Sequence, residues 1–267
     1  MFSSKNKEQV SEEDLLENQL MKENYEKMKR IFFILPSPIE ISLLIKKTGV
    51  HFRADLLNRT ENLAGYSTSP SRAIALGVYC ADLSYASLNE QYQISMEYIN
   101  VARNLAESLG VLRTVEQDKI RLLENNVTNK ELIVDIISEI YMESHEQLRE
   151  QDRYSLATLM LIGGWVESLY LATQSVNLSE KSHHELIKQI LDQKLSLESI
   201  KTILKSNQSD PVIKPIYLDI LQLEKLFEMS LKNSDKKKDA EFIDSVDELV
   251  FVQLIAKVGD IRDYLVH

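Results

Sequence analysis

Two acidic residues occupy matching positions in the two most apolar stretches of the sequence. Around each acid, similar residue types follow one another at steps of four, three and four positions, in the series Val78, Asp82, Tyr85, Asn89 and the series Gly163, Glu167, Tyr170, Gln174. This spacing places each series on one face of a helix. An acid in an apolar helix is costly to bury unless it is hydrogen-bonded, so Asp82 and Glu167 are the first candidates for a functional site.

The matching acids allow several interpretations. Both can lie on an exposed strip, or each can bind a tyrosine hydroxyl on its own helix. Alternatively both are buried, in which case they need partners such as Arg72, Tyr79 or Tyr85 and form a polar pocket between two paired helices. The similarity of the two series also allows duplication of a four-helix unit.

Tyrosine is the most frequent aromatic residue of the chain, with eleven copies against seven phenylalanines and one tryptophan. Ligand pockets favour aromatic walls with a few polar groups. The candidate ligand-binding residues are therefore the two acids and the aromatic residues near them: Tyr79, Asp82, Tyr85, Trp165, Glu167 and Tyr170. The alternative is that these rings form the edge of the core and that their hydroxyls reach solvent.

Other chemistry finds little support in the sequence. Glu180 and His183 have the Glu-x-x-His spacing of carboxylate-bridged di-metal sites, but such sites need two of these motifs and only one is present. There is no Gly-x-Ser-x-Gly motif, and Gly163-Gly164 lacks the lysine and threonine of a phosphate-binding loop. We therefore expect no catalytic residues, no metal and no cofactor.

Small residues in the two apolar stretches predict close helix packing. Gly77 and Gly163-Gly164 remove side chains where a neighbouring helix can approach. Cys80, the only cysteine, lies in the apolar run around Gly77 and is expected to be a buried, inert thiol.

Helix signals continue along most of the chain, and no segment alternates with the period of a β-strand. Proline follows a possible cap at Ser37-Pro38 and Ser69-Pro70, and capping boxes begin at Thr114 and Thr128. The expected helices cover about residues 15–28, 38–49, 69–110 with an internal break, 128–142, 152–174, 184–191, 196–204, 211–227 and 240–265, and a further helix begins at 114. The segment 152–174 is apolar nearly all round and predicts a central helix, whereas 232–239 is a charged connector.

Composition and charge bound the protein class. Seven glycines and five prolines in 267 residues favour long helices, and a net charge of −10 argues against binding to nucleic acid or to an anionic membrane surface. No window has the roughly 18 uninterrupted apolar residues of a membrane span. We predict an all-α protein with a disordered tail or tether at 1–12 and a single helical domain at 13–267, built of about eight to ten helices around two central apolar helices.

Three segments resemble a family of uncharacterised helical lipoproteins from Bacteroidetes: residues 35–41 (LPSPIEI), residues 66–85 (YSTSP through ALGVYCADLSY) and residues 163–170 (GGWVESLY). The likeness spans about residues 30 to 265. It implies a lipid-anchored protein on the periplasmic side of the cell envelope, with the polar first residues as the tether. The chain departs from the family pattern because it shows neither an export signal nor an N-terminal cysteine, and the family assigns no catalytic residues.

The sequence thus favours a non-enzymatic helical envelope protein that binds a small ligand or a protein partner in a cleft near Asp82 and Glu167. One alternative is a cytoplasmic scaffold or regulatory protein. Another is an enzyme that uses the two carboxylates as acid and base, which requires their environments to push their pKa values apart. The oligomeric state cannot be read from these patterns.

Overall fold

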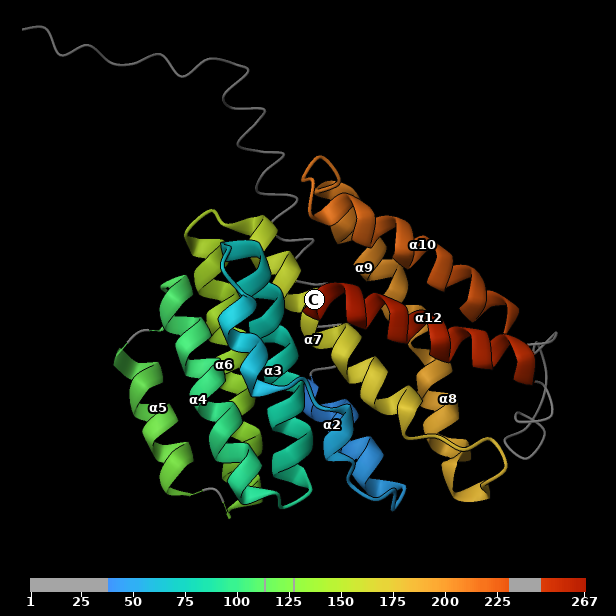
Figure 1. The fold of residues 1–267 in the computed structure, drawn as a ribbon, viewed down its shortest axis with the longest axis horizontal. Helices are drawn as coiled ribbons and strands as arrows, with labels where there is room; N and C mark the ends of the chain where they lie inside the picture. Colours follow the sequence, from blue (N-terminus) through green and yellow to red (C-terminus); the bar gives the residue numbers. More distant parts are fainter. Residues whose placement is uncertain (1–37, 113, 127, 231–245) are drawn as a thin grey trace, which may run out of the picture. The chain divides into compact units, whose positions relative to one another are not determined.

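The computed structural model describes residues 38–267 except 113, 127 and 231–245. This part of the chain forms ten α-helices and three short 3-10 helices, and it contains no β-strand (Figure 1). The prediction of an all-α multi-helix bundle is confirmed. The α-helices are α2 (Pro38–Lys47), α3 (Ser69–Leu88), α4 (Tyr92–Leu109), α5 (Thr114–Asn125), α6 (Lys130–Glu150), α7 (Tyr154–Gln174), α8 (His184–Asp192), α9 (Lys194–Ser206), α10 (Ile213–Met229) and α12 (Glu248–Val266).

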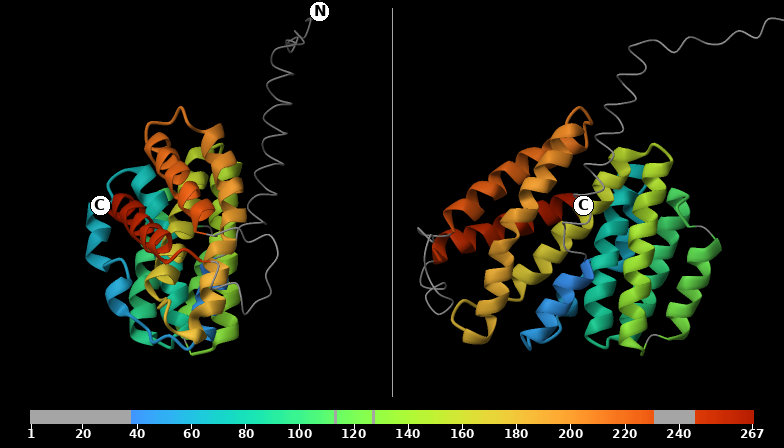
Figure 2. Two further views of the ribbon diagram at one scale, coloured as in Figure 1. Left: turned by 90° about the vertical axis from the view of Figure 1, so that its right-hand side faces the viewer. Right: turned by 180° about the vertical axis from the view of Figure 1, so that it is seen from behind.

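The two apolar helices α3 and α7 lie at the centre and pack closely against each other. The helices α4, α5 and α6 lie on the α3 side of this pair, and α8, α9, α10 and α12 lie on the α7 side (Figures 1 and 2). Every residue of α3 from Ala73 to Leu88 is buried, as is nearly all of α7 from Ala157 to Thr173. These two helices form the core around which the other helices are arranged.

Among the described helices, only α7 is long and apolar enough to cross a membrane. The structure buries 89% of its apolar window. It is covered by α2, α3, α6 and α12. A helix enclosed in this way is apolar on all sides because every side faces other side chains.

Several predicted helix ends are found at the expected residues. Gly110 ends α4 in the left-handed conformation, with a φ of 69°, and Gly49 follows α2 with a φ of 75°. Glycine adopts this conformation without the steric cost of a Cβ atom. The cap predicted at Ser37, the tail at 1–12, the helix at 15–28 and the connector at 232–239 lie outside the described residues.

Two predicted caps are wrong by one residue. Thr68, and not Ser69, caps α3: its hydroxyl accepts a hydrogen bond from the backbone N–H of Ser71, and the hydroxyl of Ser71 accepts one from the N–H of Thr68. Asn129, and not Thr128, caps α6 by accepting a hydrogen bond from the N–H of Leu132. In both cases the chain offers two adjacent polar side chains, and only one of them has extended backbone geometry before the first turn.

Two helices begin later than their sequence signals predict. The helix α10 begins at Ile213 and not at Pro211, because the carboxylate of Asp210 accepts a hydrogen bond from the N–H of Val212 and holds a turn there. The helix α12 begins at Glu248 and not at residue 240, since Asp247 caps it. Residues 240–245 lie outside the described part of the chain.

The helices α3 and α7 run in the same direction across their contact. Ile74 meets Gly163, Gly77 meets Gly164, and further along Asp82 meets Glu167. Because both residue numbers rise together, the two matching series found in the sequence lie side by side. The acids of the two series therefore meet across this interface.

Glycines allow the backbones of α3 and α7 to touch. A Cβ atom on Gly77 would overlap the carbonyl oxygen of Met160, and one on Gly163 would overlap the carbonyl oxygen of Ile74. The overlapped atoms are backbone atoms of a packed helix, so they cannot move aside independently. The predicted role of these glycines in close packing is confirmed.

Substitution of Gly77 by alanine is expected to lower the free energy of unfolding by roughly 3 kcal/mol, because overpacking against a fixed backbone strains the core. Gly259 of α12 is the matched control, since a Cβ atom there meets open space. Gly259→Ala should raise stability by about 0.5–1 kcal/mol through helix propensity. Urea unfolding followed by circular dichroism measures both, and equal effects of the two variants would contradict the close-contact interpretation.

Candidate functional site

Asp82 of α3, Glu167 of α7 and Arg262 of α12 form a buried charge cluster. Arg262 donates from Nε to Glu167 Oε2 over 3.0 Å and from Nη2 to Glu167 Oε1 over 3.4 Å. The carboxyl group of Asp82 contacts that of Glu167. Both acids have an exposed fraction of 0%, and Arg262 has one of 8%. Two acids and one cation are thus held away from water.

The charge cluster holds more acid than its single cation can neutralise. Burial, followed by the negative charge of Glu167, raises the pKa of Asp82 well above its usual range. Burial also raises the pKa of Glu167, but Arg262 and a hydrogen bond with Asp82 oppose this shift. Two buried carboxyl groups in contact repel each other strongly if both are charged, so we infer that the pair holds one proton. We place it on Asp82 Oδ1, which has no other hydrogen-bond partner and can donate a hydrogen bond to the Glu167 carboxylate.

The segment between α2 and α3 covers the charge cluster with backbone polar groups. The backbone N–H of Asn58 donates to Asp82 Oδ2 over 3.0 Å. The carbonyl oxygen of Leu56 accepts from Arg262 Nη2 over 3.4 Å, and that of Asn58 accepts from the hydroxyl of Tyr98 over 2.8 Å. These bonds fix the segment to three different helices, α3, α4 and α12.

The tyrosines that the sequence singles out lie around this segment. The Tyr79 hydroxyl donates to the carbonyl oxygen of Arg59 over 2.7 Å, and the Tyr85 hydroxyl accepts from the backbone N–H of Arg53 over 3.2 Å. The guanidinium of Arg262 lies over the ring of Tyr170, 4.9 Å from its centroid. Of the six predicted site residues, Asp82 and Glu167 belong to the charge cluster, Tyr170 contacts it through Arg262, and Tyr79 and Tyr85 bind the segment that covers it.

The position of the acids decides between the interpretations left open by the sequence. The exposed strip is wrong, since both carboxyl groups are buried. The partners expected for buried acids are also wrong: Arg72 donates to the carbonyl oxygen of Tyr66, and the hydroxyls of Tyr79 and Tyr85 bind backbone groups. The tyrosine hydroxyls named in the sequence thus serve the segment before α3 and not the acids.

Arg262 is not among the residues that the sequence patterns single out. One signal was present, because Leu254, Val258, Ile261 and Leu265 form a buried apolar stripe on α12 and Arg262 lies on the same stripe. An arginine inside an apolar stripe needs an acidic partner in the core. The spacing alone does not say which acid supplies it.

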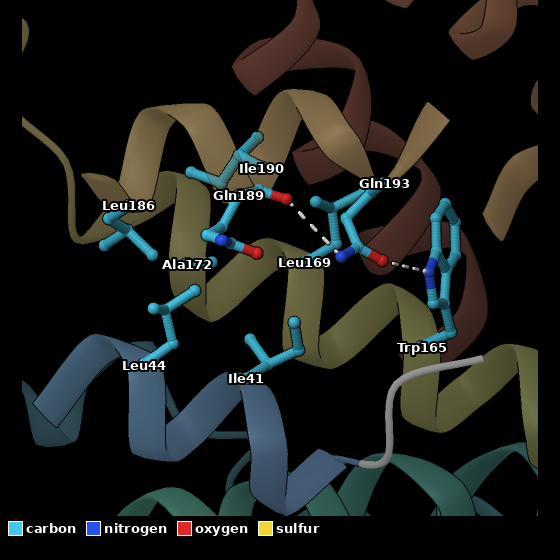
Figure 3. Close-up of a pocket in the computed structure, with 9 residues that line it drawn as sticks. All are labelled: Ile41, Leu44, Trp165, Leu169, Ala172, Leu186, Gln189, Ile190 and Gln193. Carbon is cyan, nitrogen blue, oxygen red and sulfur yellow. Dashed lines mark hydrogen bonds between the residues drawn. The ribbon is translucent and has the colours of Figure 1, made fainter. Parts of the chain in front are cut away.

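Trp165 lies apart from the charge cluster, on another face of α7. It lines a small apolar hollow between α2, α7 and α8, where its indole N–H donates to Gln193 Oε1 over 3.3 Å (Figure 3). Ile41, Leu169 and Ile190 form much of the wall around it. The hollow measures about 10 Å³, the space of a single water molecule, so it leaves no room for a ligand.

A larger hollow lies on the other side of the segment that covers the charge cluster. It has a volume of about 440 Å³. We call it the α3–α12 groove and define it by its lining residues: Glu61, Asn62, Gly65, Tyr66, Thr68, Pro70, Ser71 and Ile74 before and in α3, Val212 and Ile216 at the start of α10, and Tyr264, Leu265, Val266 and His267 at the end of α12.

Tyr66 connects this groove to the charge cluster. Its hydroxyl accepts from the side-chain amide of Asn58 over 2.9 Å and donates to the carbonyl oxygen of Val266 over 3.2 Å. The N–H of Asn58 in turn binds Asp82. None of the six predicted site residues lines the groove. Ligand binding by those six residues stays a prediction.

The Glu180 and His183 side chains contact each other at a helix start. The Nε2 atom of His183 lies 3.4 Å from Glu180 Oε2, and its Nδ1 atom accepts from the backbone N–H of Asn177. Both ring nitrogens are therefore engaged at the turn before α8. In the described part of the chain, no three histidine, cysteine or acidic side chains come together as metal ligands do.

Comparisons with known protein families, with curated proteins and with solved structures found no match for this chain. The class that the structure itself defines is an all-α helical bundle with a buried charge cluster and an open groove.

Because the proton is assigned to Asp82, we expect two isosteric substitutions to change the free energy of unfolding by unequal amounts. Asp82→Asn reproduces the protonated carboxyl group, because its amide can donate to Glu167 and its oxygen can accept from Asn58. Its free energy of unfolding at pH 5 should stay within about 1 kcal/mol of the original protein. Glu167→Gln removes the buried carboxylate that pairs with Arg262 and leaves only the exposed carboxylate of Asp263, 3.5 Å from Nη1, so it should cost about 3–5 kcal/mol. Equal losses in both variants would contradict the assignment.

The same assignment gives a pH dependence. A carboxyl group whose pKa is raised in the folded state stabilises the fold less as pH rises above about 4, its unfolded pKa. The amide of Asp82→Asn does not titrate, so the variant does not lose this stability as pH rises. The free energy of unfolding of the variant minus that of the original protein should therefore increase between pH 5 and pH 8, by at most about 1.4 kcal/mol per pH unit. Urea unfolding at several pH values measures the slope, and a difference that is independent of pH would refute it.

Proposed function

We propose that this chain is a non-enzymatic helical binding protein whose small ligand occupies the α3–α12 groove. One observation carries the proposal: the groove has a volume of about 440 Å³, within the range of about 300–1,000 Å³ typical of ligand pockets. The buried residues Tyr66, Ile74, Ile216 and Leu265 give it an apolar floor. Hydroxyl, amide and carboxylate groups surround this floor.

The lining of the groove comes from three regions that are far apart in the sequence. Residues 61–74 lead into α3, residues 212 and 216 begin α10, and residues 264–267 end α12. The Tyr66–Val266 hydrogen bond joins the first and last of these regions. The region that leads into α3 is held by the core helix α3. Tyr66 is also bound to Asn58, which lies over the charge cluster. The groove is therefore largely pre-formed.

The alternative of a carboxylate enzyme has one observation in its favour and one against it. Burial raises the pKa of both carboxyl groups, and Arg262 hydrogen-bonds Glu167 alone of the two, so the two environments differ as those of an acid and a base must. Both carboxyl groups are closed off from solvent. A catalytic group must come within hydrogen-bond reach of its substrate, so we favour a binding function and regard the charge cluster as the support of the groove.

Binding to the groove can be tested with 4-phenylbutan-1-ol, a neutral probe with an apolar body and one polar group. We expect changes in the amide NMR signals of Gly65, Ile216 and Leu265 as the probe is added. Gly65→Phe should abolish these changes, because Gly65 lines the groove and a Cβ atom there meets open space.

The matched control for this test is Gly259→Phe, which places the same ring at another glycine with open space around its Cβ atom. Gly259 does not line the groove, so this variant should bind the probe as the original protein does. If the probe leaves the signals of all groove residues unchanged in the original protein, the groove is not a binding site for small apolar ligands.

The location in the cell envelope is proposed on the resemblance to Bacteroidetes lipoproteins alone. Cell fractionation with an antibody against the natural protein tests it. Envelope location predicts recovery with the membrane fraction and release by detergent. Recovery in the cytoplasmic fraction would favour the scaffold or regulatory alternative.

A further inference from the structure

The charged and aromatic groups of the α3–α12 groove restrict which ligands it can hold. Among the described residues that line it, Glu61 is the one acidic side chain and none is a lysine or an arginine. The whole chain carries a net charge of −10. An anionic ligand would be repelled by Glu61 and by the general field of the protein, whereas a cation would be attracted by both.

Two tyrosine rings supply the second element of cation recognition. Tyr264 lines the groove with 52% of its surface exposed, and Tyr66 lines it with 7% exposed. The face of an aromatic ring attracts an ammonium group, and this attraction adds to that of a nearby carboxylate. Tyr264 is available for such a contact because about half of its surface is free.

The apolar side chains of the groove indicate what the uncharged part of the ligand must be. Ile74 of α3 and Leu265 of α12 line the groove with 5% and 6% of their surfaces exposed, and Ile216 of α10 lies behind them with none. An apolar body of moderate size removes these surfaces from water, at about 25 cal/mol for each Å² buried. A small polyamine lacks such a body and would leave these apolar surfaces exposed to water.

We propose that the α3–α12 groove binds a small organic amine with an apolar body and one ammonium group. Glu61 is the counter-ion of the ammonium group, Tyr264 offers its ring face, and the isoleucine and leucine side chains hold the body. This inference rests on the proposed function of the groove and specifies the chemical class of its ligand.

The test uses three probes with the same apolar body and different charge: 4-phenylbutylamine, 4-phenylbutan-1-ol and 4-phenylbutanoate. At pH 7 and low salt, the amine should bind about fivefold more tightly than the alcohol, since one half-exposed ion pair contributes up to about 1 kcal/mol. The carboxylate should bind more weakly than the alcohol. Dissociation constants come from NMR titration of the groove residues.

Glu61→Gln keeps the size of the side chain and removes its charge. It should reduce the preference for the amine over the alcohol and leave the affinity for the alcohol unaffected. The Tyr264 ring and the net negative charge of the protein should maintain the rest of the preference. Tyr264→Leu keeps an apolar side chain without the π face, and it should weaken amine binding more than alcohol binding. Glu107→Gln, a loss of one exposed charge on α4, is the matched control and should leave the preference for the amine intact.

The outcomes separate the two proposals. If all three probes bind equally, or if Glu61→Gln leaves the preference for the amine unchanged, the amine inference is overturned and the groove remains a binding site. If none of the probes changes the signals of the groove residues, both the amine inference and the proposed function are overturned. A fivefold preference that Glu61→Gln reduces supports both.

Discussion

The contact between the backbones of α3 and α7 determines how the rest of the molecule is arranged. Because Gly77 and Gly163 have no side chains, the two helices approach until atoms of one backbone lie against the other. Further along the same contact Asp82 and Glu167 meet with no surface exposed to solvent. Charges there interact far more strongly than at a surface, and each must find a partner or a proton.

Arg262 and Asn58 satisfy this requirement from two other parts of the chain. Arg262 brings α12 onto α7, and the backbone of Asn58 holds the segment before α3 on Asp82. That same segment continues into Tyr66, which binds the end of α12 and forms a wall of the groove. The core electrostatics and the groove are therefore parts of one connected network, and the groove depends on the charge cluster for its shape.

Much of the fold could be predicted from local signals. The long apolar run of α7, the left-handed Gly110 and the glycines of the α3–α7 contact each depend on residues close together in the sequence. Caps were misplaced where two polar residues stand side by side, as at Thr68 and Ser69. The Arg262 partnership and the groove could not be predicted, because they depend on which distant helices meet. The matching positions of Asp82 and Glu167 gave the most information, since they identified two residues that touch.

The position of Arg262 in the chain has a consequence for biosynthesis. Asp82 and Glu167 leave the ribosome long before α12 follows, so for this interval their charges have no guanidinium to offset them. The two central helices cannot reach their final dry contact at low cost while that cation is missing. We therefore expect the core to close only after α12 has emerged, with the earlier helices held in a looser, hydrated arrangement until then.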